Sequence, residues 1–346
     1  MPPVTRAGSH PSHEPTSQND TDPQNDTGEG RNETTPTDPT EFHHLPVMVH
    51  EIVEVFGSVP EGVVLDATLG GGGHSAHLLE RWPHLRILGI DRDGTALEAA
   101  RRRLAPFGTR VQTFRTRFDG LGHAMEALSI DSLSGALFDL GVSSPQLDRA
   151  DRGFSYRQDA PLDMRMDQDQ DWSATDVVNG YPVDRLAQVL RQYGDERFAH
   201  RIAAAIVAAR PIETTNRLAE VVTSAIPAPA RRTGGHPAKR TFQAIRIEVN
   251  GELDALPTAL DEAIDRTVPG GRIAVLSYHS GEDRIVKANF RHHETGGCEC
   301  PHDLPCVCDA VRTVRLVRGV PRQPSADEQA ANRRAASARL RVVERI

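Results

Sequence analysis

Apolar residues in the N-terminal half of this chain form short runs that alternate with amphipathic segments. Four segments are typical of buried strands: residues 63–66, 86–91, 110–118 and 134–140. After the first two, apolar side chains recur at a spacing near 3.6 residues, which predicts helices. Strands that alternate with helices predict an α/β fold with a parallel sheet and helices on both of its faces.

The pattern changes after about Gly153. The next stretches are helical by periodicity and are separated by Pro and Gly; they are residues 171–194, 196–210 and 215–226. The next strand-like segment is GGRIAVLSYHS, residues 270–280. We therefore expect a helical insertion at 153–240 inside one domain formed by residues 42–152 and 241–346.

Two segments near the C-terminus complete the prediction. TVRLVRG, residues 313–319, is expected to be the last strand. The basic segment SARLRVVERI, residues 337–346, is expected to be helical.

Residues 1–41 differ from the rest in composition. They contain few large apolar side chains and are rich in Pro, Thr, Asn and acids, so we expect a disordered tail. The tail carries eight acids and two arginines, and thus six of the eight net negative charges of the chain. The folded part is nearly neutral, which leaves a nucleic-acid partner open.

Neither a membrane span nor a signal peptide is expected. The chain has no run of about 18 apolar residues, and no apolar segment follows its N-terminal charges. These features predict a cytoplasmic protein.

A glycine turn and an acid predict a nucleotide-like cofactor. Gly70 to Gly73 and His74 follow the first strand, where a ligand can lie against the backbone at a helix N-terminus. Asp91 closes the second strand, where an acid can accept both hydroxyls of a ribose. NAD and S-adenosylmethionine both fit this pair, although the Gly-x-Gly-x-x-Gly spacing of dinucleotide sites is absent.

Asp139 ends the fourth strand and precedes the small residues GVSSP. It would lie beside the point where such sheets bind ligands. An acceptor there can help an exocyclic amine attack a methyl group, because the lone pair of that amine is delocalised into the base. A turn-capping aspartate is the alternative, and we favour the functional interpretation.

Long motifs extend across residues 43–345. They include LDATLGGGGHS, GIDRD, FDLGVSSPQLDRADRGFSYRQDAPLDMRMD, RTFQAIRIEVNGELDAL and GGRIAVLSYHSGEDRIVK. In these motifs the chain resembles the bacterial ribosomal RNA small-subunit methyltransferase H (MraW) family. The resemblance implies a class I, Rossmann-like, S-adenosylmethionine-dependent methyltransferase with an inserted helical domain. It also implies methylation of N4 of a cytidine in 16S rRNA of the small ribosomal subunit.

Carried over by motif, the family's cofactor-binding residues are Gly72, Gly73, His74, Asp91, Phe118, Asp139 and Gln146. Asp139 is also the candidate catalytic residue. Where the family usually has SFHSLEDR, this chain has Tyr278 and Gly281 in place of Phe and Leu, which puts the shape of that loop in doubt.

Basic residues near the end of the insertion are candidate RNA contacts, although a solvated charged face is the alternative. The candidate substrate-binding residues are Arg231, Arg232, Lys239 and Arg240, with His279 and Ser280 of the later loop. They could position RNA while the pocket takes an unstacked cytosine.

All four cysteines lie within eleven residues: Cys298, Cys300, Cys306 and Cys308. Because disulfides are rare in the cytosol, we expect reduced thiols on a mobile loop, with a structural zinc site as the alternative that the cluster suggests.

Two other functions are possible for the whole chain: an NAD-dependent oxidoreductase, and a ribosome-assembly RNA-binding protein without catalysis. The intact Asp91, Asp139 and Gln146 count against the latter.

Overall fold

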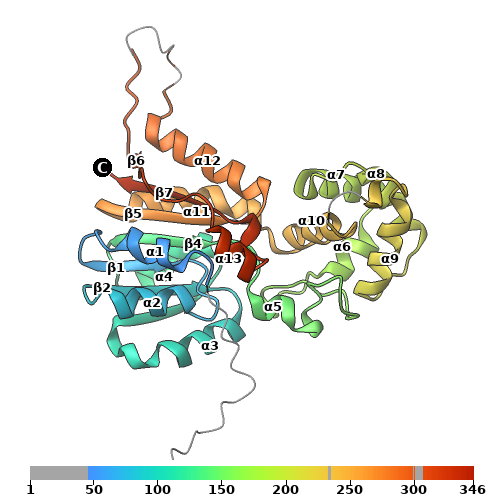
Figure 1. Cartoon of the computed structure of the whole chain (residues 1–346), viewed down its shortest axis with the longest axis horizontal. Coiled ribbons are helices and arrows are strands. Elements are labelled where there is room, and N and C mark those ends of the chain that lie inside the picture. Colours follow the sequence, from blue (N-terminus) through green and yellow to red (C-terminus); the bar gives the residue numbers. More distant parts are fainter. Residues whose placement is uncertain (1–45, 233–234, 299, 301–306) are drawn as a thin grey trace, which may run out of the picture. The chain divides into compact units, whose positions relative to one another are not determined.

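The computed structural model describes residues 46–232, 235–298, 300 and 307–346 (Figure 1). The tail predicted at 1–41 lies outside these residues. Residues from His44 to the C-terminus form one compact unit. No helix among the described residues is both long enough and apolar enough to cross a membrane.

Seven strands form one sheet in the order β3-β2-β1-β4-β5-β7-β6. The strands are β1 (Gly62–Asp66), β2 (Leu85–Asp91), β3 (Val111–Arg115), β4 (Leu133–Asp139), β5 (Thr267–Ser277), β6 (Val314–Leu316) and β7 (Arg339–Arg345). The first five pair in parallel, and β7 is antiparallel to both of its neighbours. This arrangement confirms the predicted class I, Rossmann-like α/β fold.

Helices cover both faces of the sheet. One face packs on α1 (Val49–Phe56), α2 (Gly73–Arg81) and α3 (Gly94–Leu104), and the other on α4 (Leu121–Ala127), α11 (Glu252–Arg266) and α12 (Ser280–Thr295). The strands alternate accordingly, because successive side chains point to opposite faces. Val64 and Leu137 pack on the first face, while Leu65 and Phe138 pack on the second.

The C-terminal segment corrects one prediction. Residues 337–346 were expected to be helical, but β7 lies there and pairs with both β5 and β6. Leu340 and Val342 pack on one face of the sheet and Val343 on the other. Pairing on both edges and burial on both faces outweigh the helix propensity of Ala, Arg and Leu.

Between β4 and β5 the chain is mainly helical. It contains α5 (Ser144–Asp148), α6 (Ala174–Gly180), α7 (Val183–Gly194), α8 (Ala199–Ala208), α9 (Thr215–Ala225) and α10 (Lys239–Asn250). Helices α6 to α10 share a hydrophobic cluster that runs from Phe154 to Val249, and Leu147 of α5 packs against it. The predicted boundary at residue 240 stays a prediction, but the cluster includes α10 beyond it.

Short helices complete the described chain. They are the 3-10 helices η1 (Ala105–Arg110), η2 (Phe118–Gly120), η3 (Ala150–Arg152), η4 (Ala230–Arg232) and η5 (Ala335–Ser337), and the α-helix α13 (Ala326–Ala331). The loop expected at Gly281 is the first turn of α12, capped by the side chain of His279.

Candidate functional site

A cavity opens at the carboxyl edge of the sheet, where β1, β2, β3 and β4 end. It has a volume of about 720 Å³, counting space open to solvent. Its lining includes Thr68, Gly70, Asp91, Phe118, Asp139 and Gln146, together with Asn250 and Glu252 from the chain that precedes β5. This is the edge at which doubly wound sheets bind ligands.

Asp91 is held at the cavity by two backbone groups. The N–H of Gly70 donates to its Oδ2 at 2.8 Å, and the N–H of Asp93 donates to its Oδ1 at 2.9 Å. Burial raises the pKa of Asp91 to about 6, against the lowering effect of these two bonds. Each oxygen has a further lone pair with which to accept a hydrogen bond from a ligand hydroxyl.

The glycine turn acts through its backbone and its tight packing. Gly70 lines the cavity, whereas Gly72 precedes α2 with a φ of 73°. A Cβ atom on Gly73 would lie 2.6 Å from Cγ of Pro46, so a side chain there would displace the segment before α1. Gly72, Gly73 and His74 are not among the residues that line this cavity.

Asp139 joins residues from three parts of the chain. The hydroxyl of Tyr278 donates to its Oδ1 at 2.7 Å, and Nδ1 of His74 lies 3.6 Å from its Oδ2. The backbone N–H of Asp139 donates to Oγ1 of Thr68 at 2.7 Å. Burial, with the nearby charge of Asp139, raises the pKa of Tyr278 well above its usual value, so this hydroxyl stays a donor.

Gln146 connects the segment that follows β4 to the turn after β2. Its side-chain N–H donates to Oδ2 of Asp93 at 3.0 Å, and its Oε1 accepts from the N–H of Ser143 at 3.0 Å. Nη1 of Arg152 lies 2.9 Å from the same Asp93 oxygen, and both side chains are buried. Asp93 also caps the N-terminus of α3 by accepting from the N–H of Thr95.

Phe118 forms an aromatic wall of the cavity. It begins η2 after β3, and its ring meets Phe138 edge to face, with centroids 6.3 Å apart. The sequence resemblance implies that Phe118 binds the cofactor, and an aromatic ring at the cavity could pack against an adenine ring.

Five residues of the site were missed by sequence reasoning. They are Thr68, Asp93, Arg152, Glu252 and Glu282. Only Asp93 carries a local signal, because an acid directly before a helix is a capping signal. Thr68 and Arg152 have partners in distant segments, namely Asp139 and Asp93. Glu252 instead pairs with nearby Arg246 through hydrogen bonds of 2.9 and 3.0 Å, which no pattern of residue types indicates.

Comparison with known proteins agrees with this geometry. Residues 41–346 match the MraW methylase family. The chain belongs to this family. It is 49% identical over 311 residues to ribosomal RNA small subunit methyltransferase H of Heliobacterium modesticaldum, covering 88% of this chain and 99% of that protein. The corresponding protein of Thermobifida fusca is 51% identical over 309 residues, which cover 87% of this chain and 93% of that protein.

A third relative has a similar sequence identity. Ribosomal RNA small subunit methyltransferase H of Mycobacterium sp. (strain KMS) is 49% identical over 315 residues, with 88% of this chain and 84% of that protein covered. The family resemblance inferred from the motifs is therefore confirmed, and the chain is a member of a methyltransferase family.

The candidate RNA-contacting residues of this MraW family member fall into two groups. Arg232 and Lys239 are exposed. Arg231 is also exposed, but it donates from Nε to the carbonyl of Ile226 at 2.7 Å and from Nη2 to that of Ser224 at 3.0 Å, which caps the end of α9.

Arg240 and Ser280, two other candidates, both bond to Asp195, the residue that follows α7. Nη1 of Arg240 donates to the Asp195 carbonyl at 3.3 Å, and Oγ of Ser280 donates to its Oδ2 at 2.8 Å. Nε2 of His279 lies 3.0 Å from Oε1 of Glu282. Burial raises the pKa of Glu282, but the hydrogen bond and charge of His279 outweigh it, so the net pKa is lowered.

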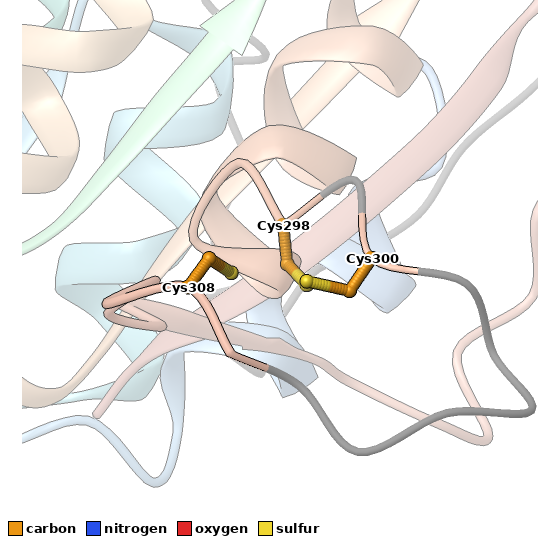
Figure 2. A group of neighbouring side chains, drawn as sticks. All are labelled: Cys298, Cys300 and Cys308. Atoms are coloured by element: carbon orange, nitrogen blue, oxygen red, sulfur yellow. The ribbon is translucent and has the colours of Figure 1, made fainter.

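Three of the four cysteines lie together. The sulfur atoms of Cys298, Cys300 and Cys308 are all within 4.8 Å of one another (Figure 2). Cys306 lies outside the described residues.

Proposed function

We propose that this protein transfers a methyl group from S-adenosylmethionine to N4 of a cytidine in 16S rRNA of the small ribosomal subunit, in the cytoplasm. Membership of the MraW methylase family and the names of the relatives support methylation of small-subunit rRNA. One observation carries the finer assignment: Asp91 and Asp139 line the same cavity.

The cavity residues fit the cofactor. Asp91 would accept hydrogen bonds from the ribose hydroxyls, and Phe118 would cover one face of the adenine. The carboxylates of Asp91 and Asp139 give the cavity negative charge, which suits a sulfonium cation. S-adenosylmethionine supplies an electrophilic methyl group there. An NAD-dependent oxidoreductase is less well supported, because the dinucleotide glycine spacing is absent.

Asp139 would act on the target amine. The N4 lone pair of cytosine is delocalised, and N4 becomes positive as it forms a bond to carbon. The hydrogen bond that the N4–H group donates to the Asp139 carboxylate becomes stronger as this positive charge develops. Asp139 therefore stabilises the transition state and can accept the departing proton.

Tyr278 and Thr68 hold Asp139 in position through hydrogen bonds of 2.7 Å each. The segment around Tyr278 resembles the SFHSLEDR motif, in which a phenylalanine without a hydroxyl stands at this position. The hydrogen bond from Tyr278 to Asp139 is therefore an addition of this chain, and it makes the carboxylate less mobile.

The test combines a cellular and a purified assay. Nucleosides of 16S rRNA from cells with and without the protein should differ by N4-methylcytidine in mass spectrometry. Purified protein should methylate small subunits with labelled S-adenosylmethionine, and Asp139→Ala should reduce the rate by about 10²-fold or more. Subunit binding without methylation would instead support the assembly-factor alternative, and methylation at another atom would refute the N4 assignment.

A further inference from the structure

The two ends of the segment that joins α12 to β6 lie side by side. The backbone N–H of Thr313 donates to the carbonyl of His293 at 3.0 Å, and Nδ1 of His293 lies 2.9 Å from Oγ1 of Thr313. A Cβ atom on Gly296 would be only 2.6 Å from the backbone of Val311. The two arms of the loop are therefore fixed against each other at its base.

The cysteines occupy both arms just beyond this base. Cys298 and Cys300 lie on the outgoing arm and Cys308 on the returning arm, and Figure 2 shows their side chains directed toward a common space. Their sulfur atoms all lie within 4.8 Å of one another. Zn–S bonds of about 2.3 Å place the sulfurs of a tetrahedral site about 3.8 Å apart, so small side-chain movements suffice.

The ring of His293, at the base of the loop, is already engaged. Nε2 of His293 lies 2.9 Å from Oδ1 of Asp261, so both nitrogens of this ring have partners. The site thus offers thiolates, which are soft ligands that select zinc over calcium or magnesium.

We propose that Cys298, Cys300 and Cys308 bind a structural zinc ion that joins the two arms of this loop. Binding displaces the thiol protons, which are released to solvent. Cys306, the fourth cysteine of the sequence-based expectation, lies outside the described residues and is not needed for a three-thiolate site.

The site is separate from the methyl-transfer cavity. Glu282 lines the cavity from the first turn of α12, whereas the cysteines follow its last turn. A helix of 16 residues spans about 24 Å at about 1.5 Å per residue. The zinc is therefore expected to stabilise α12 and the edge strand β6 without taking part in catalysis.

Elemental analysis of the full-length protein tests the proposal. After anaerobic purification with a reductant, zinc supplementation and desalting, wild type should contain about one zinc per chain. Cys298→Ser and Cys308→Ser should each lose most of it. His292→Asn is the matched control, because His292 is exposed beside the loop and is not a proposed ligand.

Two further measurements on wild type keep the test independent of variant folding. Cobalt substitution should give the thiolate-to-metal absorption band in the near ultraviolet, and chelation should accelerate proteolysis between residues 297 and 312 while S-adenosylmethionine affinity stays unchanged. Substoichiometric zinc in wild type, iron in its place, zinc lost in His292→Asn but kept in the cysteine variants, or a disulfide between these cysteines would each overturn the proposal.

Discussion

At the scale of single residues, two carboxylates end the strands on either side of β1 and differ in their surroundings. Asp91 accepts hydrogen bonds from the backbone N–H groups of Gly70 and Asp93, whereas Asp139 accepts one from the Tyr278 hydroxyl. Burial raises the pKa of Asp91 to about 6. This carboxyl therefore changes its charge close to physiological pH.

The first prediction follows from the raised pKa of Asp91. Below pH 6 the carboxyl is increasingly protonated and accepts ribose hydrogen bonds less well, so S-adenosylmethionine affinity should fall by up to about tenfold per pH unit. Calorimetry between pH 5 and 8 measures this. Asp91→Asn should bind about 1.5–3 kcal/mol more weakly at pH 8 and show little pH dependence.

If Asp91→Asn showed the same pH dependence of S-adenosylmethionine affinity as wild type, the titration would belong to another group.

The effect of pH on folding stability has the opposite sign to its effect on cofactor affinity. Because the folded-state pKa lies above its unfolded value, the contribution of Asp91 to stability is largest below pH 4 and falls as pH rises toward 6.

At the scale of elements, the segment after β4 is attached to the turn after β2 by a buried ion pair. Asp93 and Arg152 are 3% and 4% exposed, and Nη2 of Arg152 also donates to the carbonyls of Arg165 and Met166. Gln146 shares the Asp93 carboxylate. This attachment positions both Gln146 and the stretch that follows Asp139.

The second prediction compares two neighbouring arginines by urea unfolding. Arg152→Leu should lower the free energy of unfolding by about 3–5 kcal/mol, because Asp93 is then buried without its partner charge. Arg149→Leu, which removes a surface pair with Asp151, should cost less than about 1 kcal/mol. Equal losses would show that the Asp93 pair does not anchor this segment.

At the scale of the molecule, the helical part between β4 and β5 connects to the sheet through residues that line the cavity. Nη1 of Arg92, which follows β2, donates to the carbonyl of Asn250 at 2.8 Å, and its Nη2 donates to Oε1 of Gln170 at 2.7 Å. Exposed Arg232 and Lys239 lie near the end of that helical part. We propose that an RNA substrate contacts both this part and the cavity.

The third prediction concerns binding of small subunits. Arg232→Gln combined with Lys239→Gln should weaken binding and lower the slope of log affinity against log salt by about two, one for each lost phosphate contact. S-adenosylmethionine affinity should not change. Arg231→Gln should mainly lower stability, since this side chain bonds to the end of α9. Normal subunit binding by the double variant at every salt concentration would reject this RNA surface.

The sequence by itself determined the alternation of strands and helices, the glycine turn, Asp91 and Asp139. These signals are local, because strand periodicity and the residue that follows a strand can be recognised without knowing what packs against them. The same locality explains the error at residues 337–346. Their helix propensity was visible, but the pairing of β7 with β5 and β6 was not.

Tertiary structure alone decided how these residues work together. Tyr278 reaches Asp139 across 139 positions of the chain, and Arg92 reaches Asn250 across 158. It also attached the exposed Arg231 side chain to the end of α9, and it brought Cys298, Cys300 and Cys308 together. Partners this far apart depend on the packing of the whole sheet and its helices, which no local pattern records.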